Sequence, residues 1–213
     1  MWRKRLQTDG WAYFDAPNAC SLEIASALGK IVPAMREGGL VQSLRPKPAT
    51  LASSWSLSSV YGLSTFPFHT DAAHHPMPPH YIVMRLVETQ KSNCATLILP
   101  LSKSNLEASE FATLRRDVWI VNGGRGKFTT TVVNTLTDSV EEIVRFDLAC
   151  MRPCRPNFSS SLRIMLSYLQ RSVPIRIPWV KNHLLVLDNW RMLHGREAAV
   201  AGESRTLERV LIS

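Results

Sequence analysis

Hydrophobic residues occur mainly in short runs along this chain, separated by polar residues, glycine or proline. The runs are rich in Val, Ile, Leu and aromatic residues and are too short for most helices, which is typical of β-strands. The pattern predicts a turn and a short strand at 9–14, and strands at 80–88, 94–99, 118–121, 127–133, 143–150, 173–177, 183–188 and 207–212.

Three segments carry helix signals. The first runs from Leu22 to Met35 after a cap at Asn18 or Ser21, and the glycines at 38–39 end it. Its predicted buried stripe is Leu22, Ile24, Ala25, Leu28, Ile31 and Val32. A shorter helix is expected from Ser102 or Ser104 to about Arg115. The third follows Ser159–Ser161, and its predicted apolar side is Leu162, Met165, Leu166 and Leu169.

The fold expected from these elements is mainly β with flanking helices. Residues 40–65 have no clear period and are interpreted as loop with short strand pieces. Many short strands with few helices indicate a double-stranded β-helix core, also called a jelly roll or cupin-like fold. With 213 residues, of which 45% are hydrophobic, the chain is long enough for one domain over 1–213 with a substantial core.

The net charge and the cysteine content limit which binding partners and which compartment are expected. The net charge is +8, but the densest basic cluster is only Arg3-Lys4-Arg5, so a small anionic molecule is favoured over nucleic acid. The four cysteines have irregular spacing, which predicts a reduced, cytoplasmic chain without a disulfide framework. Neither a signal peptide nor a membrane span is expected, and the sequence does not indicate an oligomeric state.

The first chemical motif is Phe68-His69-Thr70-Asp71. Residues two apart in an extended segment project from the same face, so His69 and Asp71 can offer a nitrogen and a carboxylate oxygen to one ion. The alternative is a turn histidine beside a turn aspartate. Taken alone, the triplet is a weak signal.

A second motif lies far along the chain, where an apolar strand at 184–187 leads through a polar turn to His194. Two histidines and one carboxylate form the facial triad that suits iron(II) and leaves three coordination positions open. A structural zinc site would normally be closed by four protein ligands.

Two arginines follow this histidine. Arg205 lies eleven residues beyond His194, and Arg209 lies four further on. Strand residues an even number apart share a face, and arginine binds a carboxylate through two charged hydrogen bonds. The pair can therefore face one cavity, although surface cations are the alternative interpretation.

Together these motifs resemble the 2-oxoglutarate dioxygenases of the taurine dioxygenase (TauD/TfdA) and clavaminate synthase-like group. The resemblance covers about residues 62–213 in order and spacing, and more loosely begins at Asp9. The matching segments are 66–71, 78–85, 188–196 and 205–209. The chain is shorter than many members, and the part between Thr96 and His194 is trimmed, so no substrate residue of the family is carried over.

The resemblance implies roles for individual residues. His69, Asp71 and His194 would bind Fe(II), and Arg205 would bind the C5 carboxylate of 2-oxoglutarate. Thr96, which lies 27 residues after His69, matches a threonine whose hydroxyl contacts 2-oxoglutarate. Fe(II) would act with 2-oxoglutarate and O₂ as co-substrates.

The resemblance also implies oxidation of a small substrate, with release of succinate and CO₂. We expect hydroxylation, or a related oxidation, of a small carboxylate-bearing molecule such as an amino acid or a natural-product intermediate. Candidate substrate-binding residues are Arg85, Trp190, Arg196 and Arg209, and the role of Arg209 stays open between substrate and co-substrate. The alternatives are a nucleic-acid or protein demethylase of the same chemistry, or a non-catalytic metal-binding jelly roll.

Overall fold

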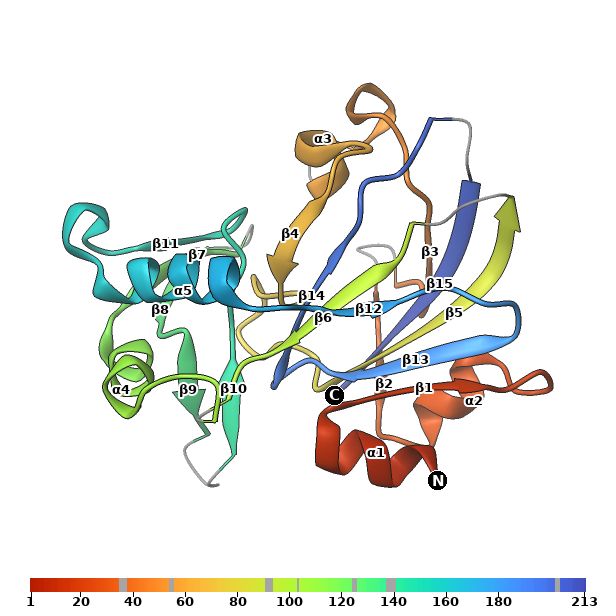
Figure 1. Ribbon diagram of the computed structural model, residues 1–213, viewed down its shortest axis with the longest axis horizontal. Helices are drawn as coiled ribbons and strands as arrows, with labels where there is room; N and C mark the ends of the chain where they lie inside the picture. The colour runs from red at the N-terminus through yellow and green to blue at the C-terminus, as the bar shows by residue number, and fades with distance from the viewer. Residues whose placement is uncertain are drawn as a thin grey trace.

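Two antiparallel β-sheets form the centre of the computed structural model, which describes residues 1–34, 38–53, 56–90, 94–102, 104–123, 126–136, 141–201 and 204–213 (Figure 1). The larger sheet has the order β1-β13-β5-β15-β2, and β3 also pairs with β15. Its strands are β1 (Trp11–Asp15), β2 (Ile31–Val32), β3 (Val41–Leu44), β5 (Tyr81–Gln90), β13 (His183–Asp188) and β15 (Ser204–Ile212).

The smaller sheet has the order β12-β6-β14-β4 and faces the larger one. Its strands are β4 (Phe66–His69), β6 (Thr96–Pro100), β12 (Ile175–Ile177) and β14 (Met192–Arg196). Side chains from both sheets meet between them in an interior core. This core contains Ile82, Met84, Leu185, Leu187 and Leu211 from the larger sheet, and Ile98, Ile177 and Met192 from the smaller. The predicted jelly roll of mainly β structure is confirmed.

The other face of the larger sheet is covered by the amino-terminal helices α1 (Trp2–Asp9) and α2 (Ser21–Ser26). Leu6 of α1 and Ala25 of α2 pack there against Val83, Leu184 and Val210. The central part of this sheet is therefore buried on both faces, which explains why residues 82–84 of β5 and 184–187 of β13 are continuously apolar.

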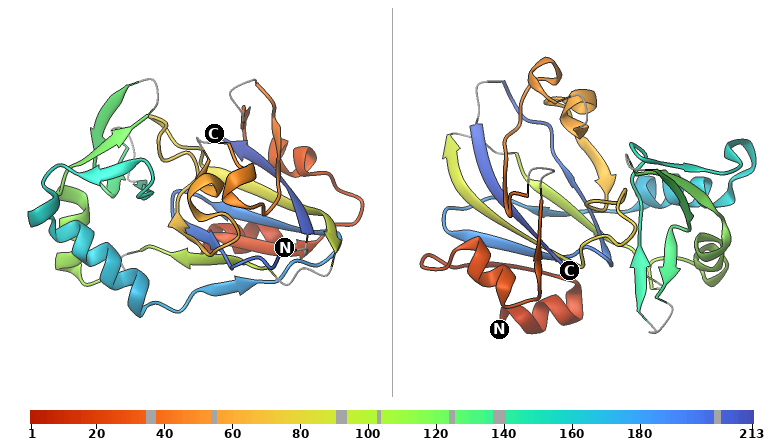
Figure 2. Two further views of the ribbon diagram at one scale, coloured as in Figure 1. Left: turned by 90° about the horizontal axis from the view of Figure 1, so that it is seen from above. Right: turned by 180° about the vertical axis from the view of Figure 1, so that it is seen from behind.

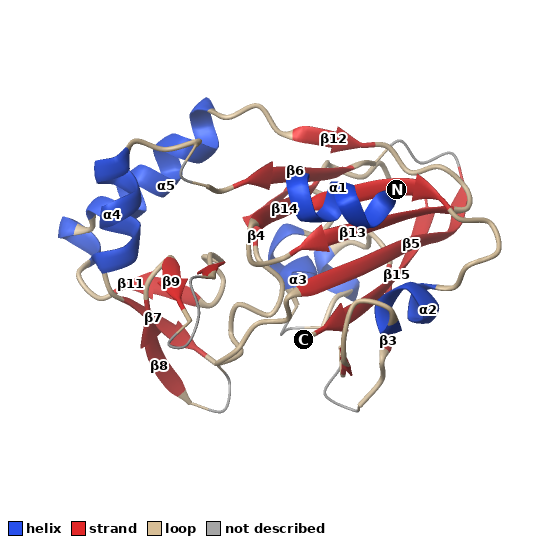
Figure 3. Cartoon of the chain, turned by 90° about the horizontal axis from the view of Figure 1, so that it is seen from below, coloured by secondary structure: helices blue, strands red, loops and turns tan. Residues whose placement is uncertain are grey.

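Residues 101–174 form a lobe beside the sandwich, between β6 and β12 (Figure 2). Two small sheets, β11-β7-β8 and β10-β9, pack with two helices that lie against each other (Figure 3). The elements of the lobe are α4 (Ala108–Arg116), β7 (Trp119–Asn122), β8 (Lys127–Thr130), β9 (Val133–Thr135), β10 (Glu142–Val144), β11 (Met151–Pro153), the 3-10 turn η2 (Pro156–Phe158) and α5 (Ser160–Arg171). The core of the lobe includes Leu99 and Leu193 of the smaller sheet, so the two parts share one hydrophobic cluster.

The prediction of a helix from Leu22 to Met35 is wrong. The helix ends at Ser26, and residues 31–32 pair with β15 instead; Met35 lies outside the described residues. A Cβ on Gly29 would lie only 2.7 Å from the carbonyl oxygen of Ser213, so this close approach of two backbones requires glycine. Pairing with a distant strand therefore overrides the local helical period.

Other predictions need smaller corrections. The predicted strand at 127–133 is divided between β8 and β9, and 143–150 contains only the end of β10. Leu166, assigned to the buried side of α5, is 48% exposed, whereas Met165 is fully buried. Within 40–65, the structure contains β3, the 3-10 turn η1 (Ala49–Leu51) and the short helix α3 (Leu57–Tyr61). The remaining predicted strands and the helix after Ser159 are confirmed in position, with shifts of a few residues at their ends.

Candidate metal centre

The two histidines of the motifs lie on neighbouring strands of the smaller sheet. His69 at the end of β4 is the register partner of His194 on β14, and their ring centroids are 4.5 Å apart. His194 also pairs with Ile98, an interior-core residue, so both imidazoles face the space between the sheets. The Nδ1 atom of His69 donates to the carbonyl oxygen of Pro67 at 2.9 Å, which leaves its Nε2 lone pair for a metal.

The carboxylate of the triad follows β4 directly. Asp71 Oδ1 lies 3.9 Å from His69 Nε2, and Asp71 Oδ2 lies 3.8 Å from His194 Nε2. The metal-binding atoms of the triad all lie within 4.8 Å of one another, and all three residues are buried. Asp71 Oδ2 has no hydrogen-bond partner despite its burial, which is expected of an atom that serves a metal ion. The donor set fits Fe(II).

Asn189 holds the backbone of Asp71 in place. Its side-chain oxygen accepts from Asp71 N at 2.8 Å, and its amide donates to the carbonyl oxygens of Asp71 at 3.1 Å and Pro79 at 2.9 Å. Asn189 is fully buried, so these bonds are shielded from water. The side chain therefore fixes both ends of residues 70–80, which we call the metal loop.

Nearby charge and burial together keep Asp71 and His194 in the protonation states that bind a metal. Burial alone would raise the pKa of Asp71, but the charge of Arg209 and the two histidines outweigh it, and the pKa is lowered. Burial lowers the pKa of His194 to about 3. At neutral pH the site therefore holds an anionic carboxylate and a neutral His194 imidazole, as metal binding requires.

Arg209 reaches this centre from the larger sheet. It pairs in register with Met84 of the interior core, so its side chain faces the triad. Its guanidinium donates to Asp71 Oδ1 and to the side-chain oxygen of Gln42 on β3. Gln42 was not predicted as a site residue, because its position opposite Arg209 depends on the pairing of β3 with β15.

Arg205 is a buried cation with unused hydrogen-bond donors. Its exposed fraction is 4%, and its Nε and Nη1 atoms have no hydrogen-bond partner. Burial is the main cause that lowers its pKa to about 10, and the nearby charge of Arg196 acts in the same direction. Buried arginines normally have their donors satisfied, so these atoms indicate a place for an anionic ligand.

Thr96 lies on the same face of the smaller sheet as Arg196, its register partner on β14. Its hydroxyl oxygen accepts from the indole nitrogen of Trp179 at 3.0 Å, and the residue is 4% exposed. Because the hydroxyl accepts this bond, its own proton is directed to another acceptor.

The side chains of the other candidate residues face away from the triad or bind backbone carbonyl oxygens instead. Arg85 pairs with Glu208 and Leu184, which places it on the helix-covered face of the larger sheet, opposite Arg209. Arg196 uses its Nη2 atom on the carbonyl oxygens of Gly62 at 2.7 Å and Ser64 at 2.6 Å.

Trp190, the remaining candidate, braces the far end of the metal loop. Its indole nitrogen donates to the carbonyl oxygen of Pro78 at 3.1 Å, and its ring stacks on His80 with centroids 3.9 Å apart. The side chain therefore supports the loop from the β13–β14 turn.

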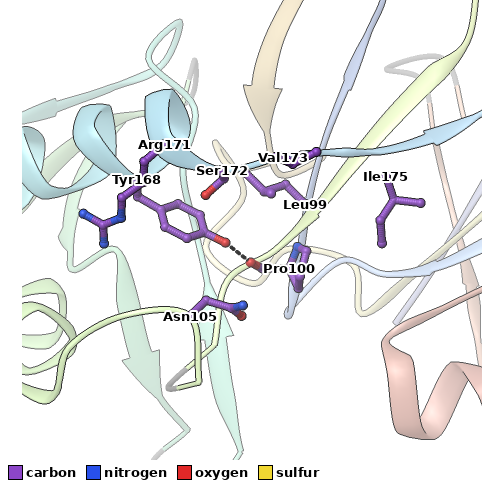
Figure 4. Close-up of a pocket in the computed structure, with 8 residues that line it drawn as sticks. All are labelled: Leu99, Pro100, Asn105, Tyr168, Arg171, Ser172, Val173 and Ile175. Atoms are coloured by element: carbon purple, nitrogen blue, oxygen red, sulfur yellow. Dashed lines mark hydrogen bonds between the residues drawn. The ribbon is translucent and has the colours of Figure 1, made fainter.

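A separate hollow of about 450 Å³ lies between α5, β6 and β12 (Figure 4). Tyr168 donates to the carbonyl oxygen of Pro100 at its edge. Its lining residues are Leu99, Pro100, Asn105, Tyr168, Arg171, Ser172, Val173 and Ile175, and they include none of the triad. The hollow is thus distinct from the metal centre.

Comparison with known proteins supports this interpretation of the site. Residues 160–211 match the family described as "Taurine catabolism dioxygenase TauD, TfdA family". No curated protein matches the sequence. The fold, the triad and this partial family match together define a non-haem iron oxygenase that depends on 2-oxoglutarate, and the matched quarter of the chain is similar to the TauD/TfdA family.

Solved structures with the same fold include an asparagine oxygenase in complex with Fe(II), 3-hydroxyasparagine and succinate, which is 18% identical with a TM-score of 0.76 over 99% of this chain and 76% of that one. The oxygenase OrfP, in complex with Fe, succinate and (3S)-hydroxy-L-Arg, is 18% identical with a TM-score of 0.68, over 89% of this chain and 62% of that one. PvcB from Pseudomonas aeruginosa is 18% identical with a TM-score of 0.69, over 99% and 78%.

None of the helices in the described part of the chain has the length and apolar character needed to cross a membrane.

Proposed function

We propose that this oxygenase hydroxylates, or otherwise oxidises, a small carboxylate-bearing molecule, with an amino acid as the first candidate. The observation that carries the proposal is Arg209, a cation beside the triad whose contacts in the structure are Asp71 and Gln42. Two of the proteins with this fold are described with a hydroxylated amino acid, 3-hydroxyasparagine or (3S)-hydroxy-L-Arg. An arginine is well suited to bind the carboxylate of such a substrate.

Arg205 and Thr96 would hold 2-oxoglutarate. The unpartnered Nε and Nη1 atoms of Arg205 would donate to its C5 carboxylate, and the Thr96 hydroxyl would donate to another of its oxygens. His69, Asp71 and His194 would hold Fe(II). Bound Fe(II) and 2-oxoglutarate supply the oxidising chemistry with O₂, and succinate and CO₂ are released.

The residues of the chain would bind and orient the substrate and exclude water from the site. The interior core closes the space between the sheets on one side of the triad, so the reacting atoms meet few competing water molecules. Arg209 and Gln42, on adjacent strands, would orient the substrate beside the metal. The lobe and the sandwich share a hydrophobic core, so we propose that residues 1–213 act as one domain.

A panel of free and modified amino acids tests this function. The purified protein with Fe(II), 2-oxoglutarate and O₂ should form succinate faster with an accepted amino acid, together with a product that has gained oxygen. Arg209→Gln should raise the KM of that amino acid. Arg85→Gln is the matched control, because it removes an arginine from the opposite face of the same sheet and should leave the KM unchanged.

Two results would contradict the proposal. Succinate formation only with oligonucleotides or polypeptides would favour a demethylase, and a protein that binds metal without consuming 2-oxoglutarate would be a non-catalytic jelly roll. The structure gives little support to nucleic acid, because Arg3-Lys4-Arg5 belongs to α1, on the face of the larger sheet that points away from the triad.

A further inference from the structure

A buried arginine of the lobe grips the metal loop. Arg145 is 3% exposed, and its Nη1 atom donates to the carbonyl oxygens of Ala73, at 2.6 Å, and His75. Its Nη2 atom donates to the carbonyl oxygen of Pro76 at 2.8 Å. The guanidinium also lies over the ring of Phe128, 5.2 Å from its centroid. Three carbonyl oxygens within residues 73–76 thus accept hydrogen bonds from one side chain.

The residue after Arg145 binds the start of the same loop. Phe146 N donates to the Thr70 hydroxyl at 3.1 Å, and Thr70 N donates to the carbonyl oxygen of Phe146 at 2.9 Å. Thr70 lies between the two ligands contributed by this loop, His69 and Asp71. The lobe therefore contacts the metal loop both between these ligands and immediately after them.

The turn after Asp71 needs such external support. Ala72 has a φ of +52°, in the left-handed region that residues with a Cβ adopt at a cost. A backbone held in this conformation persists only where surrounding contacts fix it. Arg145 binds the carbonyl of the next residue, Ala73, and Asn189 binds the backbone of Asp71 on the other side. The strained residue is thus clamped between two fixed points.

We propose that Arg145 is a positioning residue for the metal ligand Asp71, and that through it the lobe of residues 101–174 determines how tightly the triad binds iron. The proposal rests on the metal centre at the triad. Arg145 does not touch metal or substrate; it acts by fixing the backbone that carries the carboxylate. Partners of this kind typically contribute tenfold to one-hundredfold to metal affinity.

Arginine suits this position better than lysine. Two of its nitrogens, spaced by a rigid plane, reach three carbonyl oxygens on separate residues. A lysine carries its three donors on a single nitrogen, which cannot lie at the positions of both guanidinium nitrogens, so it would bind only part of this set. If Arg145→Lys binds metal more tightly than Arg145→Met, the hydrogen bonds of the side chain, and not its packing alone, position the loop.

The test measures Mn(II) affinity by titration of the full-length protein without O₂. Arg145→Met should weaken Mn(II) binding by about tenfold to one-hundredfold, and Arg145→Lys should weaken it less. Ser161→Ala is the matched control. It removes a hydrogen bond to Trp119 in the core of the same lobe, at 2.9 Å, but does not touch the metal loop. It should leave Mn(II) affinity within about twofold of wild type.

The outcomes separate the proposal from the function on which it rests. If the wild-type protein does not bind Mn(II), the metal centre itself is wrong. If the wild type binds and Arg145→Met binds equally well, or if Ser161→Ala weakens binding as much, the positioning role is overturned. Should Arg145→Met fail to fold, Arg145→Lys decides: unchanged affinity and unchanged hydrogen exchange at residues 73–75 would overturn the role.

Discussion

Replacing the buried Arg205 should raise the stability of the ligand-free protein and lower its affinity for 2-oxoglutarate. Burial lowers its pKa from 12.5 to about 10, which corresponds to about 3 kcal/mol of destabilisation of the charged side chain. Because neutral pH lies below both pKa values, this penalty is fully present there. Arg205→Met removes the charge and keeps an unbranched apolar side chain of similar reach.

We therefore expect the ligand-free variant to be more stable than wild type. The pKa of about 10 already includes the favourable interactions with Cys94 and Glu197, so a gain of up to about 3 kcal/mol is expected. For a chain of this size, the melting temperature rises by roughly 2–4 °C for each kcal/mol. Thermal unfolding monitored by circular dichroism, without 2-oxoglutarate, measures this gain.

The same variant should bind 2-oxoglutarate much more weakly than the wild type. Removing one partner of a buried charged hydrogen-bond pair costs about 2–5 kcal/mol, or roughly 30-fold to several thousand-fold in affinity. Wild-type protein with Mn(II) and 2-oxoglutarate at one hundred times its Kd should gain about 2.7 kcal/mol of stability, and the variant should gain almost none.

Arg196→Met is the control for Arg205→Met. Arg196 is also buried, but it donates to the carbonyl oxygens of Gly62 and Ser64, so its loss should destabilise the protein. If Arg205→Met were destabilised like Arg196→Met and still bound 2-oxoglutarate with wild-type affinity, Arg205 would not be an anion-binding residue.

Three further predictions follow from local geometry. Gly195→Ala should destabilise the fold by about 1–3 kcal/mol in urea and weaken Mn(II) binding, because the new Cβ would lie 2.7 Å from the carbonyl oxygen of Phe66; wild-type values for both would contradict the clash. Ser161→Ala should cost about 1–3 kcal/mol in the same assay, because it leaves the buried indole N–H of Trp119 unpaired; a smaller loss would mean that another acceptor replaces the hydroxyl. Burial raises the pKa of Cys150 to about 12, so at pH 8 only roughly one thiol in ten thousand is ionised. Mass spectrometry should find it unmodified by iodoacetamide in the folded protein but alkylated in urea, and rapid modification of the folded state would refute the assignment.

The triad was predictable because two of its members are close in sequence and because the resemblance to a known group of oxygenases implied the distant His194 as the third. His69 and Asp71 are two residues apart, and the donor types of the triad suit one metal, so their convergence with His194 required only that the two segments lie side by side. The structure places them together as register partners or close neighbours. Motif spacing thus carried most of the information on the metal centre.

Residues whose role depends on distant backbone could not be predicted in this way. Arg145 binds carbonyl oxygens about 70 positions earlier in the chain, and main-chain acceptors leave no trace in side-chain sequence. Arg85 was a candidate because its charge could hold a substrate carboxylate, but the residues just before it, 82–84, are apolar on both faces of the strand. Its pattern therefore does not reveal which residues point inward.

The position of β4 bears on how quickly the protein exchanges its metal. Among the residues that the structure describes, this strand is the last of its sheet and pairs on one side only, with a register shift between its two matched positions. Edge strands open locally far more often than a whole domain unfolds. Fraying of β4 would carry His69 away from His194, so we expect ion release to follow the local opening rate of this strand, well below the temperature at which the sandwich melts.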